Sequence, residues 1–239
     1  MNKHAFLITS AVNTKFGVFS SDQRLQQTLA TVSSIRRAVP EAKIILVEMA
    51  AIALSEAQRV ALAPAVDQII DFTADHSVQQ LYTSTDNWDV VKNVNEVMCF
   101  ARALENLLGA GTLTKFQRIF KLSGRYQLND DFKISLYDHP ANHNKVMLSR
   151  ALPSQFPKEV TNIEFQYMSR LWSWPAAITN TVIDVYNNGL AFMLSRLEQG
   201  GYADIEHILF KYLDPDLVYE VYPIGVEGNL GPNGRTVKD

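Results

Sequence analysis

The segment Lys43–Glu48 constrains the fold most, because it reads Lys-Ile-Ile-Leu-Val-Glu, a continuous apolar run that ends in an acid. A strand with one face in water alternates apolar and polar residues, whereas a strand covered on both faces is apolar throughout. Coverage on both faces is typical of parallel sheets that carry helices on either side. The run therefore predicts an inner strand of a mainly parallel sheet.

The first half of the chain repeats this pattern of strand and helix. Short apolar runs predict further strands at residues 5–8, 66–72 and 116–122. The predicted helices run from a Ser20–Gln23 capping box to Pro40, from a Ser55–Gln58 capping box to about Leu62, and over 88–108. Strands that alternate with helices in this way predict an α/β fold with a mainly parallel sheet and helices on both faces.

The second half has a different pattern. Strands predicted at 145–150 and 164–172 have no full helix between them, which favours an antiparallel addition to the sheet. Further predicted elements are a helix at 176–199 with a possible break at 188–189, a helix at 204–213, a strand at 217–222, and a Gly-rich tail at 225–239 that forms an ordered loop or a flap. Without repeats or a low-complexity linker, residues 1–239 read as one domain.

Composition excludes several classes of protein. The chain has 239 residues and a net charge of −3, so it has no overall attraction to nucleic acid or acidic membranes. Its one cysteine, Cys99, excludes an internal disulfide and lies in a helical pattern, as a small core residue would. The first apolar run is too short for a signal peptide, and no apolar stretch approaches a bilayer span of roughly 20 residues. We therefore expect a cytoplasmic protein.

Familiar motifs are missing from the sequence as well. The predicted first strand leads into Ser10-Ala-Val-Asn-Thr rather than a glycine-rich turn, which argues against a dehydrogenase. The sequence holds no Gly-Lys-Ser/Thr phosphate loop, no Gly-x-Ser-x-Gly elbow, and no His/Cys cluster with zinc spacing.

Polar residues instead follow the predicted strands where a ligand would bind. Ser10, Glu48 and the segment 123–126 all come at strand ends, and the carboxyl ends of parallel strands meet at one edge of a sheet. This arrangement resembles the Rossmann-like GT-A fold of glycosyltransferases. Residues 24–48 and 120–126 are similar to stretches of small bacterial and phage members of that class. The resemblance implies a nucleotide-binding half at 1–126, and an acceptor half with the tail at 127–239.

The resemblance also implies a nucleoside diphosphate sugar as donor, for which we expect uridine diphosphate, and a glycan or another hydroxyl compound as acceptor. The implied donor-binding residues are Thr9, Ser10, Arg24, Glu48, Lys92, Asn95, Ser123, Gly124, Arg125, Tyr126 and Arg235. A solvated helix face explains Lys92 equally well, and a loop-start acid explains Glu48.

The usual metal motif of this fold is replaced. Where GT-A enzymes carry Asp-x-Asp, this chain reads Ser123-Gly124-Arg125-Tyr126. Arg125 can bind a phosphate through two parallel N–H bonds, although a solvated turn arginine is the alternative. The one Asp-x-Asp, at Asp214, has proline in its centre and reads as a turn. The metal ligands are therefore unknown, and a role for Mn²⁺ or Mg²⁺ stays open.

On the acceptor side, the resemblance implies that Glu206 takes the acceptor proton, with Asp204 as the second choice. Asp204 also reads as a plain helix N-cap, and Glu206 as a favourable charge at a helix start. Arg170, Trp172 and Trp174 alternate along an extended segment, so they can bind the acceptor sugar, or the two indoles can close a core.

Two other functions remain open at this point. A nucleotidyltransferase on a related fold would need a glycine-rich basic loop after the first strand, which this chain lacks. A non-catalytic sugar-binding or nucleotide-binding module would need only the pocket and its aromatic residues. The sequence does not indicate the sugar, the stereochemistry of transfer or the oligomeric state.

Overall fold

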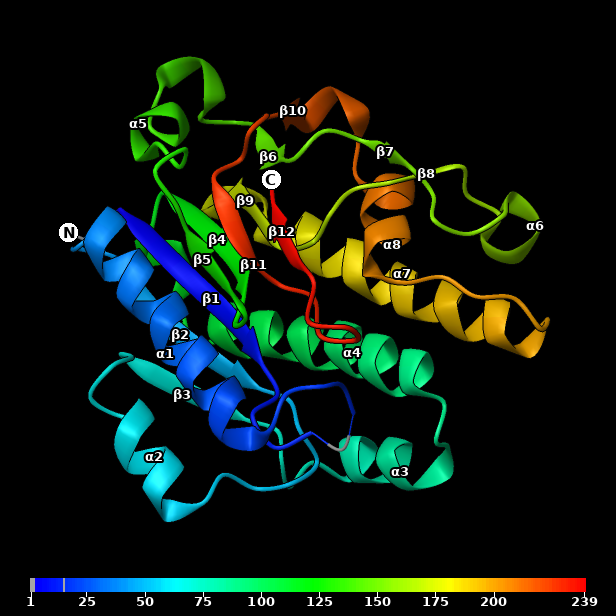
Figure 1. Ribbon diagram of the computed structural model, residues 1–239. Helices are drawn as coiled ribbons and strands as arrows, with labels where there is room; N and C mark the ends of the chain where they lie inside the picture. Colours follow the sequence, from blue (N-terminus) through cyan, green and yellow to red (C-terminus); the bar gives the residue numbers. More distant parts are fainter. Residues whose placement is uncertain (1–2, 15) are drawn as a thin grey trace.

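The computed structural model describes residues 3–14 and 16–239 (Figure 1). Within them, the main sheet has seven strands in the order β10-β6-β9-β4-β1-β2-β3. Their bounds are β1 His4–Ser10, β2 Lys43–Glu48, β3 Gln68–Asp71, β4 Arg118–Ser123, β6 Val146–Leu148, β9 Leu171–Pro175 and β10 Val218–Glu220. Strands β1 to β4 are parallel, while β9 runs antiparallel between β4 and β6. The predicted parallel sheet with an antiparallel addition is thus confirmed.

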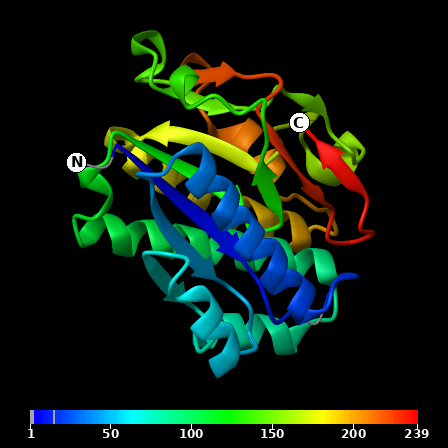
Figure 2. The ribbon, with the colours of Figure 1, turned by 60° about the vertical axis from the view of Figure 1, so that its left-hand side comes forward.

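Helices cover both faces of the sheet (Figures 1 and 2). The main helices are α1 Ser21–Ala38, α2 Glu56–Leu62, α3 His76–Ser84, α4 Trp88–Gly109, α7 Thr179–Glu198 and α8 Ile205–Tyr212. Alternate residues of β1 enter two different cores: Leu7 packs with residues of α4 and α7, and Phe6 with residues of α1. This double burial is the physical reason for the continuous apolar runs.

Helix α7 is continuous where the sequence left a break open at Asn188–Gly189. Gly189 lies against the α8 side chain of Ile208, and a Cβ atom there would overlap its Cγ2 atom. The glycine therefore serves close packing of α7 on α8 rather than a bend in the chain. Helix α3, which the sequence did not predict, follows β3 and is capped by Asp75.

The tail forms strands rather than the predicted loop or flap. β11 Val226–Asn229 pairs antiparallel with β12 Thr236–Lys238 and with β5 Tyr126–Leu128, which makes a second, three-stranded sheet. The predicted strand at 164–172 is also divided, into β8 and β9. The remaining short elements are α5 Ile134–Tyr137, α6 Lys158–Thr161, β7 Leu152–Pro153, β8 Phe165–Gln166, and single 3-10 turns at Leu113–Lys115, Pro140–Asn142, Ala176–Ile178 and Pro215–Leu217. No helix in the described part of the chain is long and apolar enough to cross a membrane.

Candidate active site

Two adjoining cavities lie beyond the carboxyl ends of β1 and β4. The small cavity has a volume of about 80 Å³ and lies between the loop after β1, α1 and the end of β4. The large cavity has a volume of about 310 Å³ and extends toward α8 and the loop that carries Phe156. Both are lined by Trp88, Lys92, Glu96, Ser123, Arg125 and Gly231. The two cavities therefore form one continuous site at the edge where this sheet type binds ligands.

The small cavity is cationic, because Arg24, Lys92 and Arg125 all line it. The Arg24 guanidinium donates to the carbonyl of Phe16 over 2.9 Å, which fixes it beneath the loop after β1. Burial and the nearby charge of Arg125 lower the pKa of Arg24 to about 10. Within the described residues, the Nε atoms of Arg24 and Arg125 are buried without a hydrogen-bond partner. Clustered cations with unused donors are an arrangement suited to an anion.

The segment Ser123–Tyr126 brings the chain close to β1. The Gly124 amide donates to the Thr9 carbonyl over 2.8 Å, and a Cβ atom at Gly124 would lie 3.1 Å from that oxygen. A side chain at this position would therefore press against β1. Tyr126 is buried, and the guanidinium groups of Arg125 and Arg170 lie 6.0 and 5.7 Å from its ring centre.

Lys121, the second residue before Ser123–Tyr126, is a fully buried cation on the α4 side of the sheet. Its Nζ atom lies 2.7 Å from Glu96 Oε1 and donates to Ser123 Oγ over 2.8 Å and to the Ser169 carbonyl over 3.0 Å. Burial alone would raise the pKa of Glu96, but the charges of Lys121 and Lys92 lower it to about 2. Glu96 is therefore an ionised carboxylate where the two cavities meet, a role that the sequence did not predict.

The other predicted donor residues have varied positions. Thr9, Ser10 and Asn95 line the small cavity, as expected. The Asn95 amide is already bonded to the Met49 carbonyl, and the Thr9 hydroxyl donates to Glu96 over 3.3 Å. Arg235 is exposed and lies outside both cavities, so its predicted contact with the donor is not supported. Gly231, in the turn between β11 and β12, lines both cavities instead.

Glu48 does not contact the cavities either, contrary to the predicted donor contact. It is fully buried, and its Oε1 atom accepts from the amides of Val12 and Ala50 at 3.1 and 3.2 Å. It therefore holds together the loops that follow β1 and β2. Burial raises the pKa of Glu48 to about 7, although these hydrogen bonds oppose the shift.

A Glu48→Gln variant is expected to change the pH dependence of stability. Because folding raises the pKa of Glu48, the side chain makes its full contribution to the free energy of unfolding below about pH 4.5. This contribution is lost as pH rises toward 7. The glutamine amide does not titrate. Between pH 5 and pH 8 the free energy of unfolding of the variant should therefore increase relative to that of the wild type by up to about 3 kcal/mol. Urea unfolding at several pH values measures this difference. Parallel curves for the two proteins would show that Glu48 titrates normally.

The two indoles predicted for the acceptor are core residues. Trp172 and Trp174 are 0% exposed, and their rings pack 4.6 Å apart against residues of α4 and α7. Their alternation put them on one face of β9, as predicted, but helices cover that face. They therefore cannot stack on a sugar. Arg170 lines the large cavity, where it forms an ion pair with Asp239.

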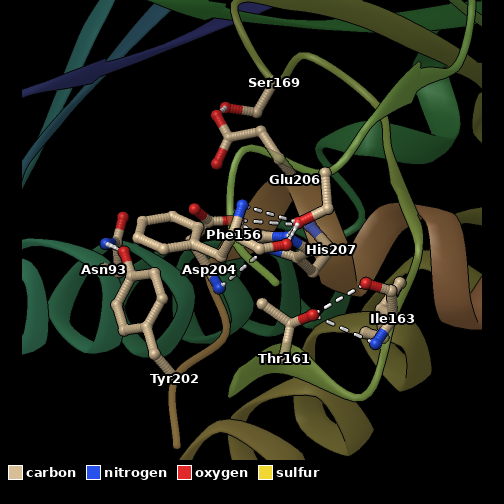
Figure 3. Close-up of polar contacts among 10 residues, drawn as sticks. Asn93, Phe156, Thr161, Ile163, Ser169, Tyr202, Asp204, Glu206 and His207 are labelled. Carbon is tan, nitrogen blue, oxygen red and sulfur yellow. Dashed lines mark hydrogen bonds and ion pairs between the residues drawn. The ribbon is translucent and has the colours of Figure 1, made fainter. Parts of the chain in front are cut away.

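Asp204 and Glu206 both line the large cavity, with different partners (Figure 3). Asp204 caps α8 and lies 2.5 Å from Nδ1 of His207, whose Nε2 atom lies 2.9 Å from Ser154 Oγ. Burial alone would raise the pKa of Asp204, but His207 holds it below its ordinary value.

This Asp204–His207–Ser154 chain has the connectivity of a hydrolase triad. However, His207 is completely buried, and the Ser154 hydroxyl is bonded to both the amide and the carbonyl of Phe156. These hydrogen bonds therefore fix the turn that carries Phe156, and they do not position a nucleophile.

Among residues 3–14 and 16–239, the Glu206 side chain has a single hydrogen bond, which it accepts from Ser169 Oγ over 2.6 Å. Burial and the negative charge of Asp204 raise the pKa of Glu206 above its ordinary value. A carboxylate whose proton affinity is raised inside a cavity has the chemistry of a general base. Between the two predicted candidates, the partners thus favour Glu206 for proton transfer and Asp204 for structure.

Comparison with known proteins agrees with this architecture. No family model matches the chain, and no curated protein matches it in sequence. Core-mannan synthase A from Aspergillus fumigatus in its Mn/GDP form matches over 95% of this chain and 74% of its own, with 9% identity and a TM-score of 0.53. The galactosyltransferase LgtC, solved with donor and acceptor sugar analogues, matches over 91% and 73%, with 11% identity and a TM-score of 0.52.

The mannosyltransferase Ktr4p from S. cerevisiae, solved with GDP, matches over 97% of this chain and 73% of its own, with 8% identity and a TM-score of 0.54. At such low identities the likeness concerns the fold alone. The chain has the GT-A fold of glycosyltransferases, an α/β fold with a mainly parallel sheet flanked by helices.

The residues at the end of β4 do not fit the divalent metal that this fold implies. Across residues 3–14 and 16–239, no three His, Cys, Asp or Glu side chains are grouped as metal ligands. Glu96, a carboxylate that lines both cavities, is bound to Lys121, and Arg125 stands where the sequence comparison with this fold expects the Asp-x-Asp motif. Asp214 and Asp216 are exposed in the 3-10 turn before β10, which confirms the turn reading.

Proposed function

We propose that the protein is a glycosyltransferase that moves a sugar from a nucleoside diphosphate sugar, with uridine diphosphate as the favoured nucleotide, to a hydroxyl group. The observation that carries this proposal is the cationic small cavity of a GT-A fold, where Arg24 and Arg125 keep buried, unused donors. Residues 1–126 would supply most of the donor side, and 127–239 the acceptor side, of one cytoplasmic domain.

In the proposed reaction, the bond between the anomeric carbon and the diphosphate breaks as an acceptor hydroxyl attacks. Arg125 and Lys92 stabilise the charge that develops on the leaving diphosphate. The ionised Glu96 faces both cavities, so it stabilises the positive charge that develops on the sugar ring. For an inverting route, Glu206 takes the proton of the attacking hydroxyl, whereas a retaining route would not require this base.

Nucleotide binding tests the proposal, because it requires an intact small cavity. UDP and GDP are each expected to raise the melting temperature of the wild type, and an Arg125→Ala variant should bind the same nucleotide about 10- to 100-fold more weakly, since a charge-assisted bond is lost. Arg235→Ala, on the exposed side of the tail, is the matched control and should bind like the wild type. Titration calorimetry measures the affinities.

One result would contradict the proposal, and a second measurement addresses the metal. If no nucleoside diphosphate binds but free glycans do, the protein would instead be a sugar-binding module. Repeating the titration with Mn²⁺ and with a chelator measures whether the site uses a metal. We expect the affinity to be similar in both, because Arg125 and Lys92 occupy the diphosphate side of the cavity.

A further inference from the structure

Carboxylates gather at the end of the large cavity away from Arg24. Asp89 on α4 lines it together with Asp204 and Glu206. Burial and the charge of Asp204 raise the pKa of Asp89. The pKa of Tyr202 is raised as well, by burial and by the charges of Asp204 and Asp89. These groups therefore line one space, and the charge of Lys92, which lines both cavities, acts in the opposite direction on the pKa of Asp204 and Glu206.

A residue that lines the same cavity carries a buried hydrogen-bond acceptor without a partner in the described residues. Asn93 is 2% exposed and lines the large cavity, where its Nδ2 atom donates to the Tyr202 hydroxyl over 2.5 Å (Figure 3). Its Oδ1 atom is buried without a donor within the described residues. Such an unused acceptor is costly unless a bound molecule supplies an N–H or O–H group.

An aromatic surface completes the cavity, in place of the buried indoles. Phe156 is 37% exposed, and its ring centre lies 4.9 Å from that of Tyr202. Figure 3 shows the two rings side by side near Asn93. The turn that carries Phe156 is held by Ser154 and His207, so the backbone at Phe156 is fixed before a ligand binds. An aromatic face of this kind packs against the apolar face of a sugar ring.

We propose that the large cavity binds the acceptor sugar, and that it selects uncharged or amine-bearing sugars over sugars with a carboxylate or a phosphate. Of the cations that also line this cavity, Arg170 is paired with Asp239, and Lys92 and Arg125 serve the diphosphate in the proposed reaction. Hydroxyl and ammonium groups satisfy Asn93 and the carboxylates, whereas an anionic group beside those carboxylates would meet like charges. The proposal rests on the proposed glycosyl transfer, since it names the acceptor class of the same site.

The test uses matched sugars that differ only in charge. Saturation-transfer NMR measures the binding of glucose, glucosamine and glucuronate, and of the matching galactose series, to the full chain with UDP or GDP present. We expect the neutral and amino sugars to bind at least about 10-fold more tightly than the uronates. An Asp89→Asn variant should reduce this ratio several-fold, while Asp216→Asn, an exposed acid outside both cavities, should leave it unchanged.

Different outcomes overturn the two proposals separately. Equal or tighter binding of uronates, no binding of any neutral or amino sugar, or an unchanged ratio in Asp89→Asn would overturn the acceptor proposal even when nucleotides bind. Loss of all nucleotide binding would instead overturn the proposed glycosyl transfer.

Discussion

Replacing Lys121 with methionine is expected to lower the free energy of unfolding at pH 7 by about 3–5 kcal/mol, since removing one partner of a buried ion pair leaves the other charge uncompensated. Lys121 is 0% exposed, and the Glu96 side chain is 13% exposed. Methionine fills a similar volume but donates no hydrogen bond. The carboxylate of Glu96, the carbonyl of Ser169 and the hydroxyl of Ser123 would each lose the ammonium group.

The double variant Lys121→Met/Glu96→Gln is the control for this prediction. It removes both charges, so it should recover most of the lost stability, as is common when a buried pair is replaced as a whole. The loss in free energy of unfolding of Lys121→Met should be smaller at pH 5 than at pH 7, because without Lys121 the buried Glu96 can take up a proton. Urea unfolding of all three proteins measures these differences. A double variant no more stable than the single one would contradict the prediction.

The secondary structure was predictable where neighbouring residues determine it. Both predicted capping boxes form, with Ser20 and Ser55 accepting from the amides of Gln23 and Gln58. Strand Lys43–Glu48 lies where its apolar run placed it. Caps and burial on both faces depend on residues close together in the chain, so the sequence alone carries them.

Elements that depend on distant partners were not predictable in the same way. Strand β11 forms because β5, about half a chain earlier, offers an open edge, and the Gly-rich sequence of the tail carries no sign of that pairing. Helix α3 is similar, because Asp75, its N-cap, is held by an ion pair with Arg102 on α4. Tertiary contacts decide such segments.

The residues of the candidate site show the same difference between local and distant determinants. The strand ends placed Ser10 and Arg125 at the cavities correctly, because the carboxyl ends of parallel strands meet at one edge. The alternation of Trp172 and Trp174 determines that they share a face, but only the packing of α4 and α7 determines that this face is covered. Phe156 was missed because its position depends on contacts with α8.

If the proposed sugar transfer is inverting, a Glu206→Gln variant is expected to reduce its kcat by about 10²- to 10⁴-fold, the usual contribution of a general base. Glutamine keeps the shape and can accept from the Ser169 hydroxyl, but it cannot take a proton. Nucleotide affinity should be unchanged, because Glu206 lies in the large cavity and not in the small one. Initial rates and calorimetry on the same protein separate the two effects.

The pH profile and a neighbouring variant make this test specific. In the wild type, the rate should rise with pH through a pKa above the ordinary carboxylate range, because burial and Asp204 favour the protonated form of Glu206. That inflection should disappear in Glu206→Gln. Asp204→Ala should instead lower stability through the lost cap of α8, with a smaller loss of kcat. Full activity of Glu206→Gln, with retained anomeric configuration by NMR, would exclude Glu206 as the base.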